Sequence, residues 1–355
     1  MKRPTPAELG YFMPAEWQRH AATWLSWPKD PETWPNRVPQ VEEIFLAMMA
    51  ALAPHEVVNL LVDDEAAEQA VRARCDFAGA ENLRFQRLPT VDSWIRDYGP
   101  NFLVSARLQL AGQRLAYNDW VFNAWGNKYE ALKQDSSIPS RLEAVLSVPR
   151  FEPGIVMEGG SIEVNGAGVV LTTEQCLLNR NRNPHLDKQQ LEDYLKAYLG
   201  VQKVLWLGEG IVGDDTDGHI DDIARFVSPT TIVCAVEEDP VDANYELLQD
   251  NLHRLQAMTD AGGRQFQIVT LPMPGNVGGS STDTRNLKRL PASYANFYIA
   301  NNVVLAPIFG QQNDTRALAI LQQLFPDRRI VGINCEPLVW GMGTIHCVTQ
   351  QQPET

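Results

Sequence analysis

The segment 213–222 reads GDDTDGHIDD, with aspartates at positions 214, 215, 217, 221 and 222 and no lysine or arginine among them. Carboxylates placed this close together repel one another unless a positive group binds near them. The apolar residues Ile220, Ile223 and Phe226 should draw the segment into the core. We therefore expect this acidic segment to face a bound cation.

Two other interpretations of the acidic segment stay open, and a third fails on spacing. The segment fits a solvated acidic turn, and it fits a transition-metal site that uses His219 and Asp221. A calcium loop with its glycine at Gly218 would place positions 1 and 12 at Gly213 and Ala224. Neither residue offers a carboxylate, so a calcium loop is not expected.

Two more clusters combine an acid with a neighbour that suits ligand binding. Trp94 precedes Asp97 by three residues in the sequence WIRDYGP, and a π face and a carboxylate can bind one cation together. Glu158 precedes two glycines, where the backbone can come close to a ligand. Each cluster also fits an exposed turn, in the first case one in which Arg96 pairs with Asp97.

Cys347 follows the glycine-rich turn 341–344, which can present its sulfur to a cleft. A thiolate beside a cationic group is a good nucleophile. The alternative is a buried, inert thiol, the most frequent state of cysteine. That state is expected for the other cysteines, Cys75, Cys176, Cys234 and Cys335.

A zinc site through Cys335, His346 and Cys347 is not favoured, because these residues lack the paired short spacing of zinc ligands. Four further histidines show no partner in the sequence pattern and are assigned no role. These are His20, His55, His185 and His253.

The elements that must position these side chains follow from hydrophobic periodicity. Helical stripes fall within 41–52, 187–199, 245–255 and 314–324. Asp187 and Asp314 are expected to cap two of these helices, Gly200 to end one, and Ser140 with Glu143 to form a capping box. β-rich runs predict strands at 57–62, 83–88, 169–173, 204–207, 232–236, 266–271 and 330–333.

A recurrence organises the chain. A small residue precedes a strand-like run with polar residues at its start, beginning at Gly99, Gly160, Gly218, Ala295 and Gly343. Intervals of roughly 50 to 80 residues favour radial or stacked units over one doubly wound sheet, although any α/β protein alternates strands and helices at such intervals. In a ring, the polar residues at these starts would meet at one axis: Asp97, Glu158, His219, Asp221 and Cys347.

Composition limits the function further. The 355 residues carry a net charge of −14, which argues against a nucleic-acid binder and permits a cationic substrate. No apolar run is long enough to span a membrane, and the N-terminus lacks the apolar core of a signal peptide. Five cysteines without a dense framework predict reduced thiols in a cytoplasmic protein. No linker separates two domains, so one domain of residues 1–355 is expected.

Taken together, the clusters resemble the agmatine deiminases of the guanidine-modifying superfamily, which also includes peptidylarginine and arginine deiminases. The resemblance runs nearly end to end and is carried by the segments 13–28, 92–100, 122–126, 158–160, 213–222 and 345–350. It implies a five-bladed α/β propeller with its active site on the pseudo-symmetry axis, which agrees with the five-fold recurrence.

The resemblance also implies a role for each residue of the site. Cys347 matches the nucleophile, His219 the general acid and base, and Glu158 the acid that orients and charges this histidine. The resemblance also implies substrate-binding positions: Asp97 and Asp221 at the guanidinium and Asp215 at the far amine. Trp94 stays a substrate-binding candidate through its π face. The resembled family usually has the sequence Gly-Gly-Gly-Asn before Ile-His-Cys, whereas this chain has Gly341-Met-Gly-Thr344.

The implied reaction is hydrolysis of agmatine to N-carbamoylputrescine and ammonia through an amidino-cysteine intermediate, a step of putrescine and polyamine biosynthesis. It needs no cofactor and no metal. The expected partner is a small cationic guanidine, with no nucleic acid or membrane, and a homo-oligomer is left open. Three alternatives remain: deimination of free or peptidyl arginine, amidino transfer to an amine, and a non-catalytic propeller that serves as an assembly factor.

Overall fold

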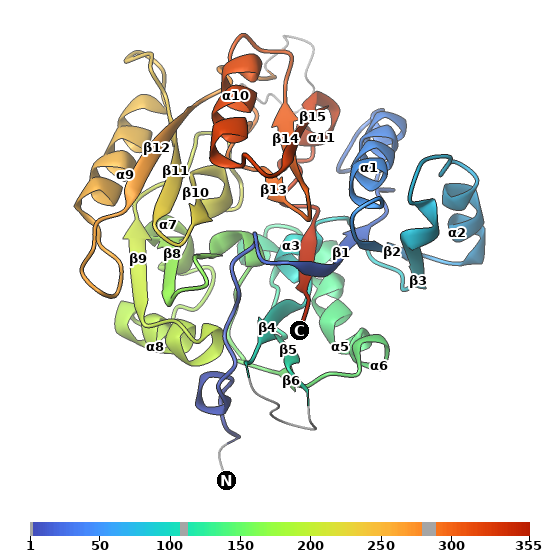
Figure 1. The fold of residues 1–355 in the computed structure, drawn as a ribbon, viewed down its shortest axis with the longest axis horizontal. Coiled ribbons are helices and arrows are strands. Elements are labelled where there is room, and N and C mark those ends of the chain that lie inside the picture. Colours follow the sequence, from blue (N-terminus) through green and yellow to red (C-terminus); the bar gives the residue numbers. More distant parts are fainter. Residues whose placement is uncertain (1–2, 107–112, 279–288) are drawn as a thin grey trace.

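The computed structural model describes residues 3–106, 113–278 and 289–355, which form an α/β protein with five small sheets (Figure 1). Listed in spatial order, one sheet is β16 (Gln350–Pro353), β1 (His20–Ser26), β2 (Val57–Val62) and β3 (Leu83–Arg87). The others are β4 (Asn101–Val104), β5 (Leu115–Asn118) and β6 (Arg150–Phe151); β7 (Glu163–Val164), β8 (Val169–Thr173) and β9 (Lys203–Leu207); β10 (Ala224–Ser228), β11 (Thr231–Val236) and β12 (Gln267–Pro272); and β13 (Tyr298–Ile299), β14 (Val303–Ile308) and β15 (Arg329–Asn334).

All five sheets share one pairing pattern. A short first strand pairs antiparallel with the second, and the second pairs parallel with the third. The sheet of β1 follows the same pattern, with β16 from the C-terminus as its antiparallel first strand. Parallel neighbours need a crossover connection, and a helix usually supplies it. Four long helices do so here: α1 (Val38–Leu52), α8 (Lys188–Leu199), α9 (Tyr245–Ala257) and α10 (Asp314–Leu324).

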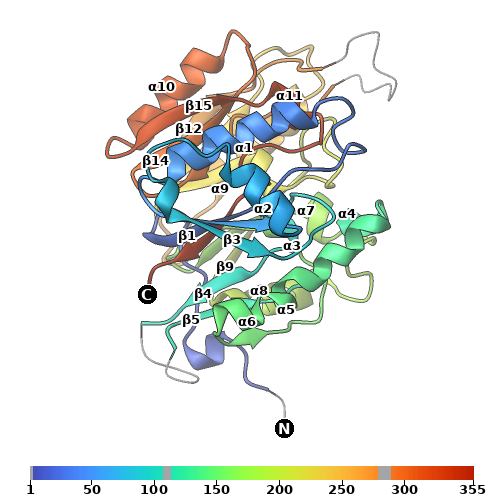
Figure 2. The ribbon, with the colours of Figure 1, turned by 90° about the vertical axis from the view of Figure 1, so that its right-hand side faces the viewer.

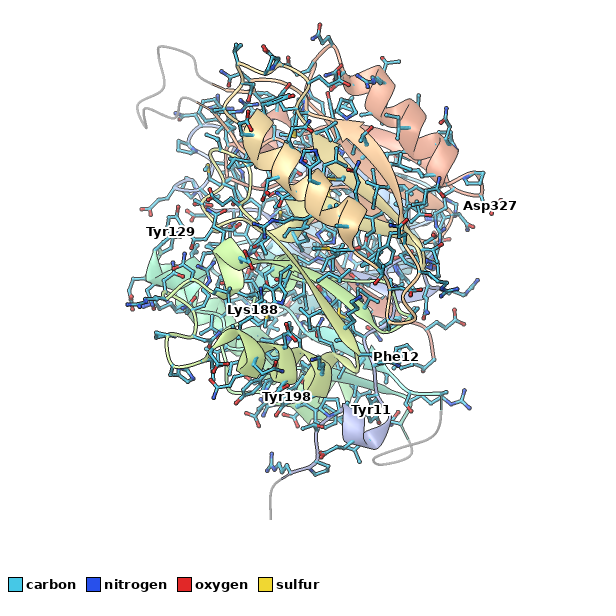
Figure 3. All side chains as sticks on the ribbon, turned by 90° about the vertical axis from the view of Figure 1, so that its left-hand side faces the viewer. Tyr11, Phe12, Tyr129, Lys188, Tyr198 and Asp327 are labelled. Carbon is cyan, nitrogen blue, oxygen red and sulfur yellow. The ribbon has the colours of Figure 1, made fainter. Side chains whose placement is uncertain are left out.

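In Figure 1 the sheets follow one another in chain order around the centre of the molecule, with the long helices on the outside. Figure 2 shows α1 and α2 (Glu65–Arg72) covering one side. In Figure 3, α8 and α9 lie at the opposite surface, with Lys188 and Tyr198 on α8. The shorter helices are α3 (Ile95–Tyr98), α4 (Ala124–Asn127), α5 (Ile138–Arg141), α6 (Glu143–Leu146), α7 (Glu174–Leu177) and α11 (Glu336–Val339).

The helix ends confirm one capping prediction and correct two others. Asp187 and Gln190 form a capping box on α8, and Gly200 ends that helix with a φ of 66°. The capping box predicted at Ser140 is wrong, because its hydroxyl donates to the carbonyl of Ser137 and α6 has no side-chain cap. Asp314 is the first residue of α10 rather than its cap, and its carboxylate accepts N–H groups from the turn before the helix.

The strands predicted from β-rich runs are confirmed to within one or two residues, but the recurring segments need correction. The segments that begin at Gly218 and Gly343 are turns, and their sheets begin later, with β10 and β16. Asp97 likewise lies on the short helix α3. The polar residues of the recurrence therefore lie in the turns that lead into each first strand. The expectation of a buried thiol is wrong for Cys75, which lies beyond the end of α2 at Arg72 and is only half-buried.

The five cysteines are free thiols, as predicted, and Cys234 lies in the buried strand β11. Within the described residues, no helix is long and apolar enough to cross a bilayer.

Candidate active site

The candidate site lies where the turns before the five first strands converge. Asp97 precedes β4, Glu158 precedes β7, His219 precedes β10, Asn296 precedes β13 and Cys347 precedes β16. All five residues are buried. Each sheet thus contributes one turn to a common centre.

Gly160 marks how tightly these turns pack. A Cβ atom at Gly160 would lie 2.6 Å from Nδ1 of His219, 2.9 Å from Oδ1 of Asp97 and 3.1 Å from Oδ2 of Asp221. Real Cβ atoms do not come this close to polar atoms, so the position needs glycine for close approach rather than for its torsion angles. These three side chains therefore meet around one point, although 124 positions separate the first and last of them in sequence. The alternative of an exposed turn in which Arg96 pairs with Asp97 is excluded by the burial of both residues.

The two carboxylates expected to bind a guanidinium differ in their partners. Asp97 accepts N–H groups on both oxygens, from the indole of Trp125 at 2.9 Å and from the backbone of Gly160 at 2.9 Å. Asp221 accepts from His346 on Oδ2 at 2.7 Å, whereas its Oδ1 is buried without a hydrogen-bond partner among the described residues. A buried carboxylate oxygen without a hydrogen-bond partner costs free energy unless a ligand donates a hydrogen bond to it. Asp221 therefore keeps one buried oxygen that no described group completes.

His219 is held between two acids without a close bond to either. Its Nδ1 lies 3.8 Å from Oδ1 of Asp97, its Nε2 lies 3.9 Å from Oε2 of Glu158, and Nε2 has no hydrogen-bond partner among the described residues. Burial lowers the pKa of His219 to about 3, against the raising effect of the Asp221 charge. The imidazole is thus neutral before a ligand binds.

Glu158 is fully buried, which corrects the alternative of an exposed turn. Its Oε1 accepts from Nε of Arg182 at 2.7 Å, and Arg182 also donates to Asp217 and to the carbonyl of Thr216. Burial raises the pKa of Glu158, and the Arg182 charge opposes this shift. Sequence analysis missed Arg182, because a single arginine in a loop carries no pattern that links it to an acid 24 residues earlier.

The Cys347 sulfur is nearly buried, with 7% of the residue exposed, and lines a cavity. Sγ lies 3.9 Å from Oδ2 of Asp221 and accepts from Nδ2 of Asn296 at 3.2 Å. Burial raises the pKa of the thiol well above its ordinary value, and the charges of Asp221, Asp222 and Asp97 raise it further. The free site therefore holds a thiol rather than a thiolate.

Asn296 is a site residue that sequence analysis missed. Its Oδ1 accepts from the Thr344 hydroxyl at 2.7 Å and from the backbone N–H of His346 at 3.0 Å, which turns its N–H group toward Sγ. An amide N–H stabilises a thiolate more than a thiol, because it can only donate. The recurrence did contain a signal, since Asn296 stands at the start of the fourth recurring unit.

Hydrogen bonds within the acidic segment fix its shape, and cationic side chains from other loops neutralise part of its charge. Asp214 accepts backbone N–H groups from Thr216, Gly218 and His219, so it shapes the turn that carries the histidine. Asp217 pairs with Arg182 and with Lys128, which lie outside the segment. A solvated turn is therefore wrong for most of the segment, and the positive groups it lacks come from other loops.

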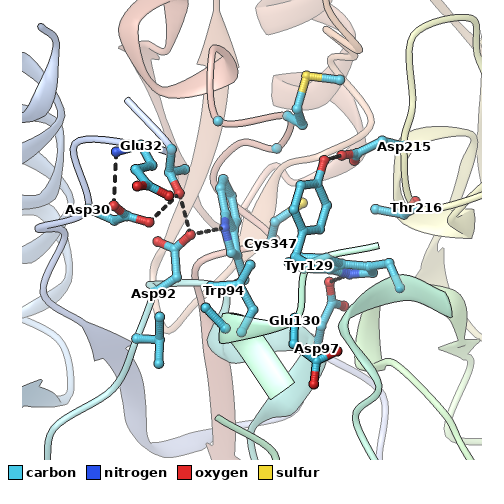
Figure 4. Close-up of a pocket in the computed structure, with 18 residues that line it drawn as sticks. Asp30, Glu32, Asp92, Trp94, Asp97, Tyr129, Glu130, Asp215, Thr216 and Cys347 are labelled. Carbon is cyan, nitrogen blue, oxygen red and sulfur yellow. Dashed lines mark hydrogen bonds between the residues drawn. The ribbon is translucent and has the colours of Figure 1, made fainter. Parts of the chain in front are cut away.

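A cavity of about 450 Å³ opens from Cys347. Figure 4 shows Cys347 between Trp94 and the pair Tyr129–Asp215. The Trp94 indole donates to Asp92 at 2.9 Å, and the Tyr129 hydroxyl donates to the Asp215 carboxylate. No lysine, arginine or histidine is among the residues described as lining the cavity, whereas its acidic residues are Asp30, Glu32, Asp92, Asp97, Glu130 and Asp215. The cavity is thus suited to a cation.

Met342 and Thr344 occupy positions at which the family pattern usually has glycine and asparagine. Met342 lines the cavity with a φ of 76°, a left-handed conformation that favours glycine. Thr344 is buried and bonded to Asn296. Met342 thus lines the cavity, and Thr344 bonds to the asparagine whose N–H group donates to the Cys347 sulfur.

One cluster of side chains has the composition of a metal site. Within the described residues, Glu158, Cys176 and His219 form the one group of three potential ligands, with ligand atoms within 4.8 Å of one another. The Arg182 guanidinium, 2.7 Å from Glu158, already neutralises that carboxylate and would repel a metal ion. The zinc set considered from sequence, Cys335 with His346 and Cys347, does not form such a group.

Comparisons with known proteins agree with one another. Residues 12–353 match the family described as Porphyromonas-type peptidyl-arginine deiminase. The agmatine deiminase of Ectopseudomonas mendocina is 38% identical over 98% of this chain and 97% of its own, and that of Medicago truncatula is 38% identical over 98% of both. The solved agmatine deiminase of Enterococcus faecalis superposes with a TM-score of 0.91 at 35% identity, covering 100% of this chain and 99% of its own.

Proposed function

Because the chain belongs to the Porphyromonas-type peptidyl-arginine deiminase family, we propose that it hydrolyses agmatine to N-carbamoylputrescine and ammonia through a covalent intermediate on Cys347. One observation carries this proposal. The Cys347 thiol lies beside a buried carboxylate, Asp221, that keeps one oxygen unpartnered. A guanidinium N–H can donate a hydrogen bond to that oxygen, and this bond would place the central guanidinium carbon near the sulfur.

In the proposed complex, Asp221 and Asp97 hold the guanidinium plane through charge-assisted hydrogen bonds. The positive charge of the substrate offsets the carboxylate charges that raise the pKa of Cys347. The thiol proton passes to the neutral His219 as the sulfur bonds to the central carbon. Asn296 donates an N–H group to the sulfur as its charge develops.

His219 then gives that proton to one nitrogen, the carbon–nitrogen bond breaks, and ammonia leaves. Water attacks the carbon of the amidino-cysteine and loses a proton to His219. The carbon–sulfur bond breaks as the carbonyl forms, His219 returns its proton to the departing sulfur, and the remaining hydroxyl proton passes to solvent, so that the thiol, the neutral imidazole and the ureido product are released. Glu158, close to Nε2 of His219, favours the protonated imidazole that exists between these steps.

The lining of the cavity supports agmatine over free arginine. Agmatine carries an ammonium at its far end, whereas arginine adds a carboxylate there, which the acidic lining would repel. Asp215 is the proposed partner of the ammonium, next to the Tyr129 hydroxyl that already donates to it. Trp94 lines the same path and supplies an apolar face for the methylene chain.

We also propose that the five sheets are the blades of one five-bladed α/β propeller that comprises residues 1–355. The repeated pairing pattern and the convergence of five turns support it.

Ammonia release from a panel of guanidines tests the proposed function. Agmatine should be the preferred substrate, with free arginine and a peptidyl arginine turned over far more slowly. Addition of glycine should produce no amidinated glycine, since water is the proposed acceptor. Release from peptidyl arginine but not from agmatine, or no release from any guanidine, would refute the proposal.

A further inference from the structure

His346 directly precedes Cys347, yet its ring faces away from the substrate cavity. Nδ1 lies 2.7 Å from Oδ2 of Asp221, and Nε2 lies 2.8 Å from Oε2 of Glu16. The residue is 1% exposed, so water does not replace either partner. Ionised carboxylates only accept hydrogen bonds, so both ring nitrogens must donate. The geometry therefore describes a buried imidazolium between two carboxylates.

Glu16 extends this contact into a charge-balanced cluster. Its Oε1 lies 2.9 Å from Arg225, whose Nε donates to Glu163 at 2.9 Å, and Arg96 lies 3.6 Å from Oε2 of Glu16. The backbone N–H of Ile299 also donates to Glu16 at 2.8 Å. With His346 as a cation, the acids Asp221, Glu16 and Glu163 are matched by His346, Arg225 and Arg96. Buried charges are tolerated when they are paired in this way.

The cationic charge of His346 helps to keep Asp221 ionised. Burial alone would raise the pKa of Asp221, but the hydrogen bond and the charge of His346 keep it below its ordinary value. The other ionisable groups near this carboxylate are His219, Asp97, Asp222 and Cys347, together with the Arg225 charge. Without the imidazolium, the excess negative charge would favour a proton on one of the acids.

We propose that His346 is a positioning residue of this enzyme, which keeps Asp221 ionised and turns its free Oδ1 toward the substrate guanidinium. The inference rests on the proposed function, because it assigns Asp221 to guanidinium binding. It gives the N-terminal segment around Glu16 a role as well, since Glu16 holds the far side of the ring. His346 itself does not touch substrate.

His346→Asn tests the proposal, because the asparagine amide can still donate to Asp221 but carries no charge. kcat/KM for agmatine should fall about 10-fold or more near neutral pH, and the acid limb of its pH profile should move up by about one unit or more. Loss of the cation raises the pKa of Asp221, so the variant should regain activity as the pH rises. KM should increase more than kcat falls.

His20→Asn is the matched control. His20 is also buried and lies 3.3 Å from a glutamate, Glu56, and its Nε2 lies 2.7 Å from the backbone carbonyl of Glu16 rather than from the Glu16 carboxylate that contacts His346. Its replacement should lower the melting temperature without moving the pH profile. If both variants lose activity with an unmoved acid limb, His346 has only a structural role and the proposal is overturned.

A measurement without substrate separates this inference from the proposed function. The chain has six histidines, so selective ¹⁵N-histidine labelling gives a simple spectrum, and the signals lost in His346→Asn assign the ring. Both nitrogens should be protonated near neutral pH in the unmodified chain. A neutral tautomer would overturn the inference whether or not agmatine is the substrate. If agmatine is not turned over but the ring is a cation, the proposed function fails while the charge state of His346 stands.

Discussion

Cys347 and His219 lie in surroundings that favour their neutral forms. Burial and the nearby carboxylates raise the pKa of the thiol, and burial lowers the pKa of the imidazole to about 3. A guanidinium bound between Asp97 and Asp221 would offset the charges that oppose thiolate formation. The substrate is therefore expected to take part in activating its own nucleophile.

The resting thiol can be tested by alkylation. Iodoacetamide reacts with thiolates, so modification of Cys347 in the free protein should be slow near neutral pH and should rise only above the ordinary thiol range. Asp221→Asn removes a charge that raises the thiol pKa, from a carboxyl whose own pKa lies below its ordinary value, and should speed modification at fixed pH. Peptide mass spectrometry measures both rates. Rapid alkylation of Cys347 near neutral pH in the protein without substitutions would contradict the assignment of a resting thiol.

A second prediction separates chemistry from packing. Cys347→Ala should abolish turnover and leave agmatine binding, measured by calorimetry, because the carboxylates remain in place. Cys335→Ala removes a buried thiol outside the cavity and should stay active. Equal loss of activity in both variants would show that folding, rather than the nucleophile, was affected.

A third prediction concerns the far end of the substrate. Asp215→Asn should lower kcat/KM for agmatine about 5- to 150-fold, because a partly buried charge-assisted contact contributes about 1–3 kcal/mol. An alkylguanidine without the ammonium should be affected much less. A similar loss on both substrates would mean that Asp215 only supports the turn, through its contact with Tyr129.

At the scale of elements, the site is built from turns, and this decides how much of it the sequence could predict. The central strands, such as β2 and β8, were predictable because buried β-rich runs have a strong pattern. Asp97, His219 and Cys347 were found because they stand at recurring positions. Arg182 and Tyr129 were not, since their contacts depend on how separate loops pack, and no spacing within the chain encodes that.

The turn at Gly160 allows a test at this scale. Gly160→Ala would place a Cβ atom 2.6 Å from Nδ1 of His219, so the side chains around it must move. A displacement of catalytic side chains by about 1 Å can cost about 100-fold in rate, so kcat should fall by about that factor. Gly262→Ala is the control, because its Cβ would meet only a side-chain oxygen of Asp260 at 3.3 Å. Unchanged kcat in Gly160→Ala would refute the packing described here.

At the scale of the whole molecule, pairing of β1 with β16 joins the two ends of the chain in one sheet. Because every sheet contributes a turn to the site, we propose that residues 1–355 unfold as one unit. Calorimetry should show a single transition whose midpoint rises when agmatine is added to the Cys347→Ala variant. Two resolved transitions, only one of which responds to agmatine, would show separate units.

The central claim is that water replaces one nitrogen of agmatine by way of Cys347, and the mass of the product tests it most directly. With agmatine in water enriched in oxygen-18, the account predicts N-carbamoylputrescine that carries one labelled oxygen, together with ammonia, and none of either from Cys347→Ala. Formation of putrescine and urea, or an unlabelled product, would contradict it.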